Sequence, residues 1–249
     1  MSRVNRIPLC FELQKADRMG NTAGMYSVKP PLYVWVRFIA ASVETGLRAL
    51  IADQQGTLSR YRVREVIPVL GEAPPALSEG WSVLRIESSV PISFSDKLLA
   101  SRSSSVTQFI GVTQHLRYTS DTQREELDRR SLSELRASSH TIAVLIPIGK
   151  SVEWWKLARG KRYAYFQKSD AHEGHTAIGN KYVDRIFRKL YHSRHLNDVR
   201  GYDFLTYFEF KDTYEQDFRT LLAGLRDARK NPEWAFVTNE FEIWMTKVG

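Results

Sequence analysis

Apolar and polar residues alternate along much of the chain, and this pattern predicts most of its secondary structure. Strands are expected in segments rich in β-branched and aromatic residues, at 32–40, 60–70, 81–90, 107–119, 140–148, 183–193, 202–210 and 236–245. Helices are expected where caps or a 3.6-residue period occur, at 42–56, 93–106, 152–169 and 214–230, with a short helix or turn after His175. Ser151 is the expected N-cap of the third helix.

The order of these elements indicates an α+β fold. The second half reads β-α-β-β-α-β, which is the ferredoxin-like plan, and the first half gives a rougher version of the same order. We therefore expect two ferredoxin-like lobes with antiparallel sheets covered by helices, at 1–125 and 140–249. The polar, charge-dense stretch 120–139 is the expected connector between them.

Composition limits the partners and the compartment. The chain has 36 basic and 28 acidic residues among 249, a net charge of +8 that attracts anions without choosing among them. Its single cysteine, Cys10, excludes an intramolecular disulfide and favours a reducing compartment. The N-terminal apolar run is short for a signal peptide, and no stretch reaches the ~18–20 apolar residues of a membrane span. We expect a cytoplasmic protein with no membrane partner.

RNA binding is one alternative that these residues raise. The segment "RGYDFLTY" (Arg200–Tyr207) fits the aromatic octamer on the third strand of RNA-recognition modules at all but one position, where Asp203 replaces a small residue. Two features oppose this interpretation. The first strand of the lobe lacks the partner aromatic, and Asp203 would place a carboxylate where phosphates pass. Ordinary strand packing explains Phe204 and Tyr207 equally well, so nucleic acid is the disfavoured partner.

Several motifs of the second half resemble the chlorite dismutase family, which includes the coproheme decarboxylases. The motifs are "IPIGKSVEWW" (Ile146–Trp155), "GHT" (Gly174–Thr176), "RKLYHS" (Arg188–Ser193) and "YDFLTYFE" (Tyr202–Glu209), with a fainter match in "IGVTQHLRYTS" (110–120). The resemblance covers about 140–230 and keeps the spacing from His175 through Arg188 to the next strand.

This resemblance implies a heme b enzyme that converts chlorite to chloride and dioxygen. The sheets are expected to form a barrel-like core, with heme in the C-terminal lobe. His175 aligns with the iron ligand, the role of a neutral imidazole. Arg188 aligns with the distal arginine, a permanent cation that would hold the anionic substrate. The remaining matches align with cofactor contacts: Tyr118, Ile146, Lys150, Trp154, Trp155, Leu190, Thr206 and Phe208.

The chain departs from the family pattern around the axial ligand. The stretch between Trp155 and His175 is longer than usual and includes His172, which is the second candidate ligand. The family's acidic partner of the axial histidine aligns with Lys230, which cannot accept a hydrogen bond. Asp227 or Glu233 are the alternatives for that partner.

Two residues separate the branches of the family. Coproheme decarboxylases have a redox tyrosine where this chain has Ile146, and they lack the arginine found here as Arg188; both differences favour the chlorite-cleaving branch. The length resembles that of the pentameric members, so a homopentamer acting on a small anion is expected. A heme-binding relative with a peroxidase-like, biosynthetic or sensing role is the second hypothesis.

Overall fold

A computed structural model describes residues 34–42, 56–71, 77–91, 106–113, 141–194, 196 and 201–248, which belong to one compact unit, Leu32–Gly249. The expected helices 42–56 and 93–106, apart from their end residues 42, 56 and 106, lie outside the described residues. So do the connector 120–139 and Tyr118.

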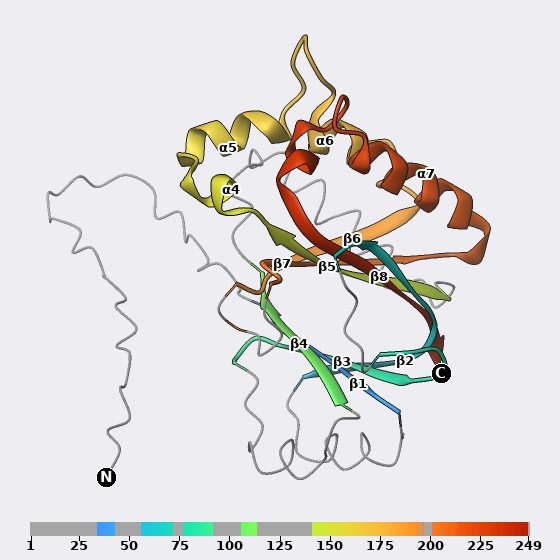
Figure 1. Cartoon of the computed structure of the whole chain (residues 1–249). Coiled ribbons are helices and arrows are strands. Elements are labelled where there is room, and N and C mark those ends of the chain that lie inside the picture. The colour runs from blue at the N-terminus through green and yellow to red at the C-terminus, as the bar shows by residue number, and fades with distance from the viewer. Residues whose placement is uncertain are drawn as a thin grey trace, which may run out of the picture. The chain divides into compact units, whose positions relative to one another are not determined.

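The described strands form a closed antiparallel barrel, and each of them lies within or overlaps a segment where the sequence predicts a strand (Figure 1). Their order around the barrel is β1-β3-β2-β8-β5-β7-β6-β4. Their bounds are β1 Trp35–Ala41, β2 Thr57–Leu70, β3 Ser82–Ser88, β4 Val106–Val112, β5 Ile142–Lys150, β6 Ile186–His192, β7 Phe204–Phe210 and β8 Val237–Val248.

The barrel is closed by two unequal seams between its first and second four strands. Strand β2 pairs with β8 from Arg60↔Val248 to Leu70↔Glu240, with two register shifts on the way. On the other side, β4 meets β6 through the pair Val112↔His192. The long seam therefore carries most of the hydrogen bonding between the two sets of strands.

Side chains of the β5–β8 sheet point alternately into the barrel and toward the helices, as the period of a strand requires. On β6, Phe187 and Tyr191 join the apolar core of the barrel, together with Phe38 of β1. On β7, Phe208 and Phe210 belong instead to a second core with helix α7. One sheet therefore separates the barrel interior from a layer under the helices.

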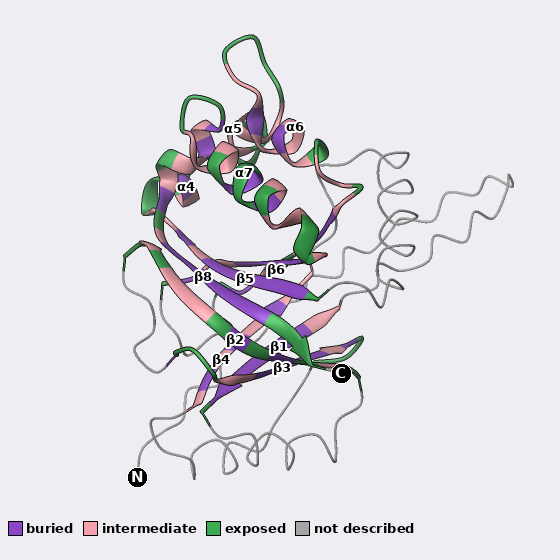
Figure 2. Cartoon of the chain, turned by 90° about the vertical axis from the view of Figure 1, so that its right-hand side faces the viewer, coloured by how far each residue is buried: buried purple, intermediate pink, exposed green. Residues whose placement is uncertain are grey.

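The helices cover the outer face of the β5–β8 sheet, on the side away from β1–β4 (Figure 1). Their bounds are α4 Val152–Lys156, α5 Arg159–Phe166, α6 Gly174–Asn180 and α7 Glu215–Arg226, with 3₁₀ turns η1 Asp212–Tyr214 and η2 Pro232–Phe236. Helix α7 buries its apolar positions against the sheet and exposes its other side (Figure 2). Phe218, Leu221 and Leu222 are the buried residues, as its periodicity predicts, and each contributes roughly 1.5–3 kcal/mol.

The single helix expected at 152–169 is two helices in the structure. Ser151 caps α4 as predicted, because its hydroxyl accepts a hydrogen bond from the Trp154 N–H at 3.4 Å. Leu157 then takes an extended conformation, with ψ of 134°, and ends the helix. The break lets α5 fold back over Trp154, whose ring lies 5.9 Å from that of Phe166.

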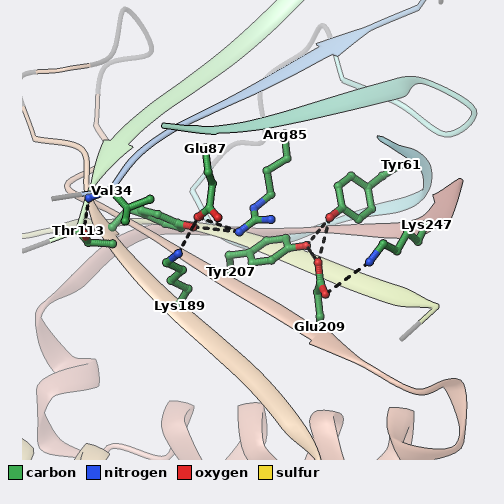
Figure 3. A network of polar contacts seen from close by, with 10 residues as sticks. Val34, Tyr61, Arg85, Glu87, Thr113, Lys189, Tyr207, Glu209 and Lys247 are labelled. Atoms are coloured by element: carbon green, nitrogen blue, oxygen red, sulfur yellow. Dashed lines mark hydrogen bonds and ion pairs between the residues drawn. The ribbon is translucent and has the colours of Figure 1, made fainter. Parts of the chain in front are cut away.

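A polar network crosses the barrel interior between the two sets of strands (Figure 3). Arg85 of β3 forms a 2.8 Å ion pair with Glu87 and lies 4.4 Å from the centre of the Tyr207 ring. Glu87 in turn pairs with Lys189 of β6 at 2.9 Å and accepts a hydrogen bond from Tyr191. These contacts join β3 to β6 and β7.

A second branch of the network lies around Glu209 of β7 (Figure 3). Its Oε1 atom accepts hydrogen bonds from the phenols of Tyr61 and Tyr207, which lie 2.7 Å from each other. Burial, reinforced by the charge of Glu209, raises the pKa of Tyr61 to about 12. The phenols therefore stay protonated and donate at every physiological pH.

Candidate functional site

His175 is the second residue of α6, so the expected short helix contains this histidine and does not follow it. The preceding Gly174 has a φ of +75°, and its N–H donates to the carbonyl of Lys230 at 2.9 Å. A Cβ atom on Gly174 would lie 2.4 Å from the carbonyl oxygen of Gln167. Both the dihedral angle and the crowding require glycine at this position. The backbone at the start of α6, and with it the position of His175, is fixed by this contact.

The imidazole is held by a buried carboxylate and ammonium pair. His175 Nδ1 lies 2.9 Å from Glu233 Oε2, and Glu233 Oε1 lies 2.7 Å from Lys150 Nζ. The Lys150 ammonium also donates to the Glu233 carbonyl at 3.3 Å. The side chains of Lys150 and Glu233 are only 4% and 8% exposed, so this contact is screened little by water.

Burial and the nearby charges keep His175 neutral. Burial, and then the Arg188 cation, lowers the pKa of His175, and the opposing effect of Glu233 is smaller. Burial alone would raise the pKa of Glu233, but Lys150 and then His175 overcome it and set the pKa at about 2. Ionised Glu233 therefore accepts a hydrogen bond from Nδ1–H, and Nε2 keeps the lone pair that could bind a metal.

Aromatic side chains pack against this trio. The ring of Phe166 meets that of His175 edge-on at 5.7 Å, and Lys150 Nζ lies 5.0 Å from the centre of the Trp154 ring. Trp154 is fully buried and also packs on Phe236 at 5.4 Å. The trio is thus fixed by packing as well as by hydrogen bonds.

Arg188 lies on the helix-facing side of β6 and reaches α6. A Cβ atom on Gly179, one turn after His175, would lie 3.9 Å from Arg188 Nη1. Among the described residues, the buried Nε atom of Arg188 has no hydrogen-bond partner. Burial lowers the pKa of Arg188, with Glu233 opposing, yet an arginine remains charged at neutral pH. This cation therefore has unused capacity for an anion.

Apolar and aromatic residues line the same side of the sheet. Leu190 follows Arg188 in the row and is 40% exposed, unusual for a leucine on the covered face of a sheet. The strand pairs Arg188↔Phe208 and Leu190↔Thr206 place all four residues on adjacent strands. His192 ends the row, packed edge-on against Phe204 at 4.9 Å, and burial lowers its pKa to about 4.

Most of the site residues expected from the sequence lie in this layer. Ile146 of β5 is 2% exposed and packs in the core that includes Ile178 of α6. Trp155 stacks on Phe204 at 5.8 Å. Tyr118 lies outside the described residues.

Of the two candidate ligands, only His175 has an acidic partner among the described contacts. The buried Nδ1 atom of His172 has no hydrogen-bond partner within the described part of the chain. Of the alternatives for the acidic partner, Glu233 makes the contact, whereas Asp227 bonds to Arg229. The described residues contain no group of three or more His, Cys, Asp or Glu suited to a bare metal ion.

The comparisons with known proteins agree with this fold. The family model described as chlorite dismutase matches residues 88–243, which is more than half of the chain. The chain therefore belongs to the chlorite dismutase family. A chlorite dismutase of Ideonella dechloratans is 32% identical over 130 residues, which are 51% of this chain and 42% of that protein. The match thus spans less than half of that relative's length.

Solved structures of the family share the fold. A dimeric chlorite dismutase of Nitrobacter winogradskyi is 25% identical, with a TM-score of 0.57 over 85% of this chain and 99% of that one. A chlorite dismutase of Candidatus Nitrospira defluvii, solved in complex with imidazole, is 21% identical, with a TM-score of 0.60 over 87% and 91%. None of the described helices is long and apolar enough to cross a membrane.

Proposed function

We propose that the protein binds heme b through His175 and converts chlorite to chloride and dioxygen, with Arg188 as the anion-holding residue. Family membership supports chlorite cleavage as the general activity. The observation that carries the proposal for this chain is the buried trio of His175, Glu233 and Lys150 beside an arginine with an unpaired Nε atom.

The residues present fit a heme. The neutral imidazole, held at Nδ1, offers Nε2 to an iron, and its carboxylate partner fixes the orientation of the ring. The apolar side chain of Leu190, which is 40% exposed, suits the face of a porphyrin, and basic groups suit its carboxylates. We therefore assign Trp154, Trp155, Ile146, Thr206 and the other expected contacts to the surroundings of the cofactor.

Each residue has a distinct task in the proposed reaction. Bound heme would supply a redox-active iron with one open position. Glu233 stays ionised because of Lys150, so it keeps the Nδ1–H of His175 as a donor and makes the imidazole a stronger ligand. Arg188 would attract the chlorite anion and hold it in the site, an electrostatic and proximity role.

The arrangement of the whole chain is also part of this proposal. Strand orders β4-β1-β3-β2 and β8-β5-β7-β6 both follow the 4-1-3-2 order of a ferredoxin-like sheet. We assign them to an N-terminal lobe at 1–125 and a heme-binding C-terminal lobe at 140–249. A homopentamer is the assembly we propose, and light scattering would distinguish it from the dimer named for the Nitrobacter protein.

The RNA-binding alternative has no exposed aromatic surface on its strand. Tyr207 is fully buried in the barrel, and Tyr202 is 9% exposed. Phe204 is covered by the Trp155 ring. Bases could not stack on these side chains without unfolding the core, and ordinary packing explains them.

Steady-state oxygen evolution from chlorite by the hemin-loaded protein tests this function. The parent should evolve oxygen, and Arg188→Ala should bind hemin equally well but lose about 10²-fold in rate, the scale for loss of one preorganised charged donor. Arg188→Lys should recover part of that rate, because it restores the charge without the planar fork.

Arg229→Ala is the matched control, since that side chain is 92% exposed and, within the part of the chain that the structure describes, forms a local ion pair with Asp227. It should match the parent. Equal oxygen evolution by Arg188→Ala and the parent would contradict the role given to Arg188. Hemin uptake by the parent without any oxygen evolution would favour the second hypothesis, a heme protein with another reaction.

A further inference from the structure

One carboxylate, that of Asp203, joins the turn after β5 to the start of β7. Its Oδ2 atom accepts two hydrogen bonds, from the backbone N–H of Lys150 at 2.8 Å and from the indole Nε1–H of Trp155 at 3.2 Å. Lys150 ends β5 and Trp155 lies in α4, so both donors belong to the segment Lys150–Trp155 that joins the two elements, here called the Lys150–Trp155 turn. The same turn carries the ammonium of the His175 trio and the indole that faces Phe204.

The backbone of Asp203 is itself fixed on both sides. Its N–H donates to the carbonyl of Ile148 at 2.8 Å, and its carbonyl accepts from Ser193 at 2.9 Å and Arg194 at 3.2 Å. Asp203 therefore lies directly before β7 and is hydrogen-bonded to the chain at the ends of β5 and β6. A side chain anchored to three strands can hold a neighbouring turn with little freedom.

Arg194 completes the arrangement around the indole. Its Nε atom lies 3.5 Å from Asp203 Oδ1, and its guanidinium carbon lies 3.8 Å from the centre of the Trp155 ring. Phe204 stacks beneath the same ring with an interplanar angle of 16°. The Trp155 ring therefore contacts both a cation and a phenyl ring, and Asp203 accepts the hydrogen bond from its N–H.

We propose that Asp203 is a positioning residue that fixes the Lys150–Trp155 turn and thereby the orientation of His175 and the wall of the cofactor pocket. Its effect on the cofactor rests on the proposed function. The path runs from Asp203 to the Lys150 backbone, then through the Lys150 ammonium to Glu233 and His175. A separate path runs to the Trp155 indole.

Substitutions at Asp203 separate the two hydrogen bonds from the charge. Asp203→Ala removes both. Asp203→Asn keeps an oxygen acceptor for the two N–H groups and loses only the ion pair with Arg194. Asp184→Ala is the matched control, because that side chain is 66% exposed and its ion pair among the described residues is with its neighbour Arg185.

The first measurement needs no cofactor. The contribution of Trp155 to the near-ultraviolet circular dichroism is the difference between the spectra of the parent and of Trp155→Phe. The spectrum of Asp203→Ala should lack this contribution, whereas the spectra of Asp203→Asn and Asp184→Ala should retain it. An unchanged signal in Asp203→Ala would overturn the proposal.

The second measurement is hemin affinity. Asp203→Ala should weaken hemin binding about 10- to 100-fold, the range for loss of an outer-shell partner of a metal ligand, and should shift the ferric absorption bands. Asp203→Asn should recover most of the affinity. The double variant should lose less hemin-binding free energy than the sum of the losses in Asp203→Ala and Trp155→Phe, because both substitutions act in part on the same indole.

Additive losses, or an Asp203→Asn variant as weak as Asp203→Ala, would overturn the proposal. Far-ultraviolet circular dichroism checks that the variants fold, and Asp203→Ser replaces Asp203→Ala in the same cycle if the alanine variant does not. If the parent takes up no hemin, the proposed function fails, while the near-ultraviolet measurement still decides whether Asp203 positions the turn.

Discussion

Glu233 shows how a few charges at one place decide the chemistry of a residue. Its carboxylate is buried, which by itself favours the protonated form, yet contacts with Lys150 and His175 keep it ionised with a pKa of about 2. The contact with Glu233 orients His175, whereas burial and the Arg188 cation lower the pKa of the imidazole and keep it neutral. Attraction to its two partners offsets the desolvation cost of burying this carboxylate, and loss of either partner would leave the buried charge without full compensation.

The first prediction concerns the stability of this carboxylate against pH. Its pKa in the folded protein, about 2, lies below the ordinary 4.5, so its contribution is complete above pH 4.5 and is lost as pH falls toward 2. Glu233→Gln should therefore be less stable than the parent at pH 7, by up to about 3 kcal/mol from this linkage. Urea unfolding at several pH values measures the difference, which should shrink between pH 4.5 and 2.

The control for that prediction is Glu79→Gln, on an exposed turn between β2 and β3. It should show no comparable pH-dependent difference. A Glu233→Gln variant whose deficit stays constant from pH 7 to pH 2 would contradict the assignment of an ionised, stabilising carboxylate.

At this scale the sequence named candidate residues but not the contacts that connect them. The motifs around His175 and Arg188 singled out both residues, and the structure places Arg188 beside the helix that carries His175. Glu233 was one of two alternatives because the aligned position was Lys230. The structure explains the offset: the Lys230 carbonyl, not its side chain, binds the Gly174 N–H, and the following 3₁₀ turn brings Glu233 inward. Asp203 carried no such signal, since its partners are set by tertiary structure.

At the scale of elements, the start of α6 is the feature on which the site depends. Gly174 is the first residue of α6, and a Cβ atom on it would collide with the Gln167 backbone. Any side chain at this position would force the backbone to shift, and His175, the next residue, would shift with it. The register of this helix start therefore sets the position of the imidazole.

The second prediction follows from that crowding. Gly174→Ala should destabilise the fold by more than about 1 kcal/mol, because a left-handed conformation and a 2.4 Å contact both disfavour alanine. It should also weaken hemin binding. Thermal unfolding and hemin titration measure the two effects.

Gly160→Ala is the matched control on α5, where an added Cβ atom would meet nothing within 4 Å. Since alanine favours a helix over glycine, this variant should be neutral or more stable by about 0.5–1 kcal/mol. Equal behaviour of the two variants would contradict the role given to Gly174.

Secondary structure was predictable here because local patterns dictate it. The alternation of strands and the periodic face of α7 placed those elements correctly, and Ser151 marked the start of α4. The break between α4 and α5 was missed, since Leu157 carries no local stop signal. It follows from the burial of Trp154 among Phe166, Tyr165 and Phe236, which a linear pattern cannot show.

At the scale of the whole molecule, the barrel joins strands from distant parts of the chain. Alternation shows which face of a strand is apolar but not which strand it meets, so the β2–β8 seam could not be read from the pattern. The polar network inside the barrel, around Arg85 and Glu209, connects the two sets of strands through hydrogen bonds and ion pairs. Its members are spread from residue 61 to residue 247, which hid it from sequence reasoning.

The third prediction tests that network. Arg85 is 4% exposed and holds Glu87 and Tyr191. Arg85→Ala should destabilise the fold by about 3–5 kcal/mol, because it leaves a buried carboxylate with only part of its compensation. Urea unfolding followed by far-ultraviolet circular dichroism measures this.

Arg64→Ala is the control, since Arg64 is 41% exposed and its 3.4 Å contact with Glu215 lies at the surface. Its effect should stay within about 1 kcal/mol. Similar stabilities of the Arg85 and Arg64 variants would show that the barrel does not depend on its interior charges.

Hemin titration of the parent, His175→Ala and His172→Ala tests the central claim most directly. The parent and His172→Ala should bind one hemin per chain with the same absorption spectrum, whereas His175→Ala should lose the ligand field of an axial imidazole and most of the affinity. If His175→Ala retains the parent's spectrum and affinity, or if His172→Ala loses them instead, His175 is not the ligand and the site described here is not the heme site.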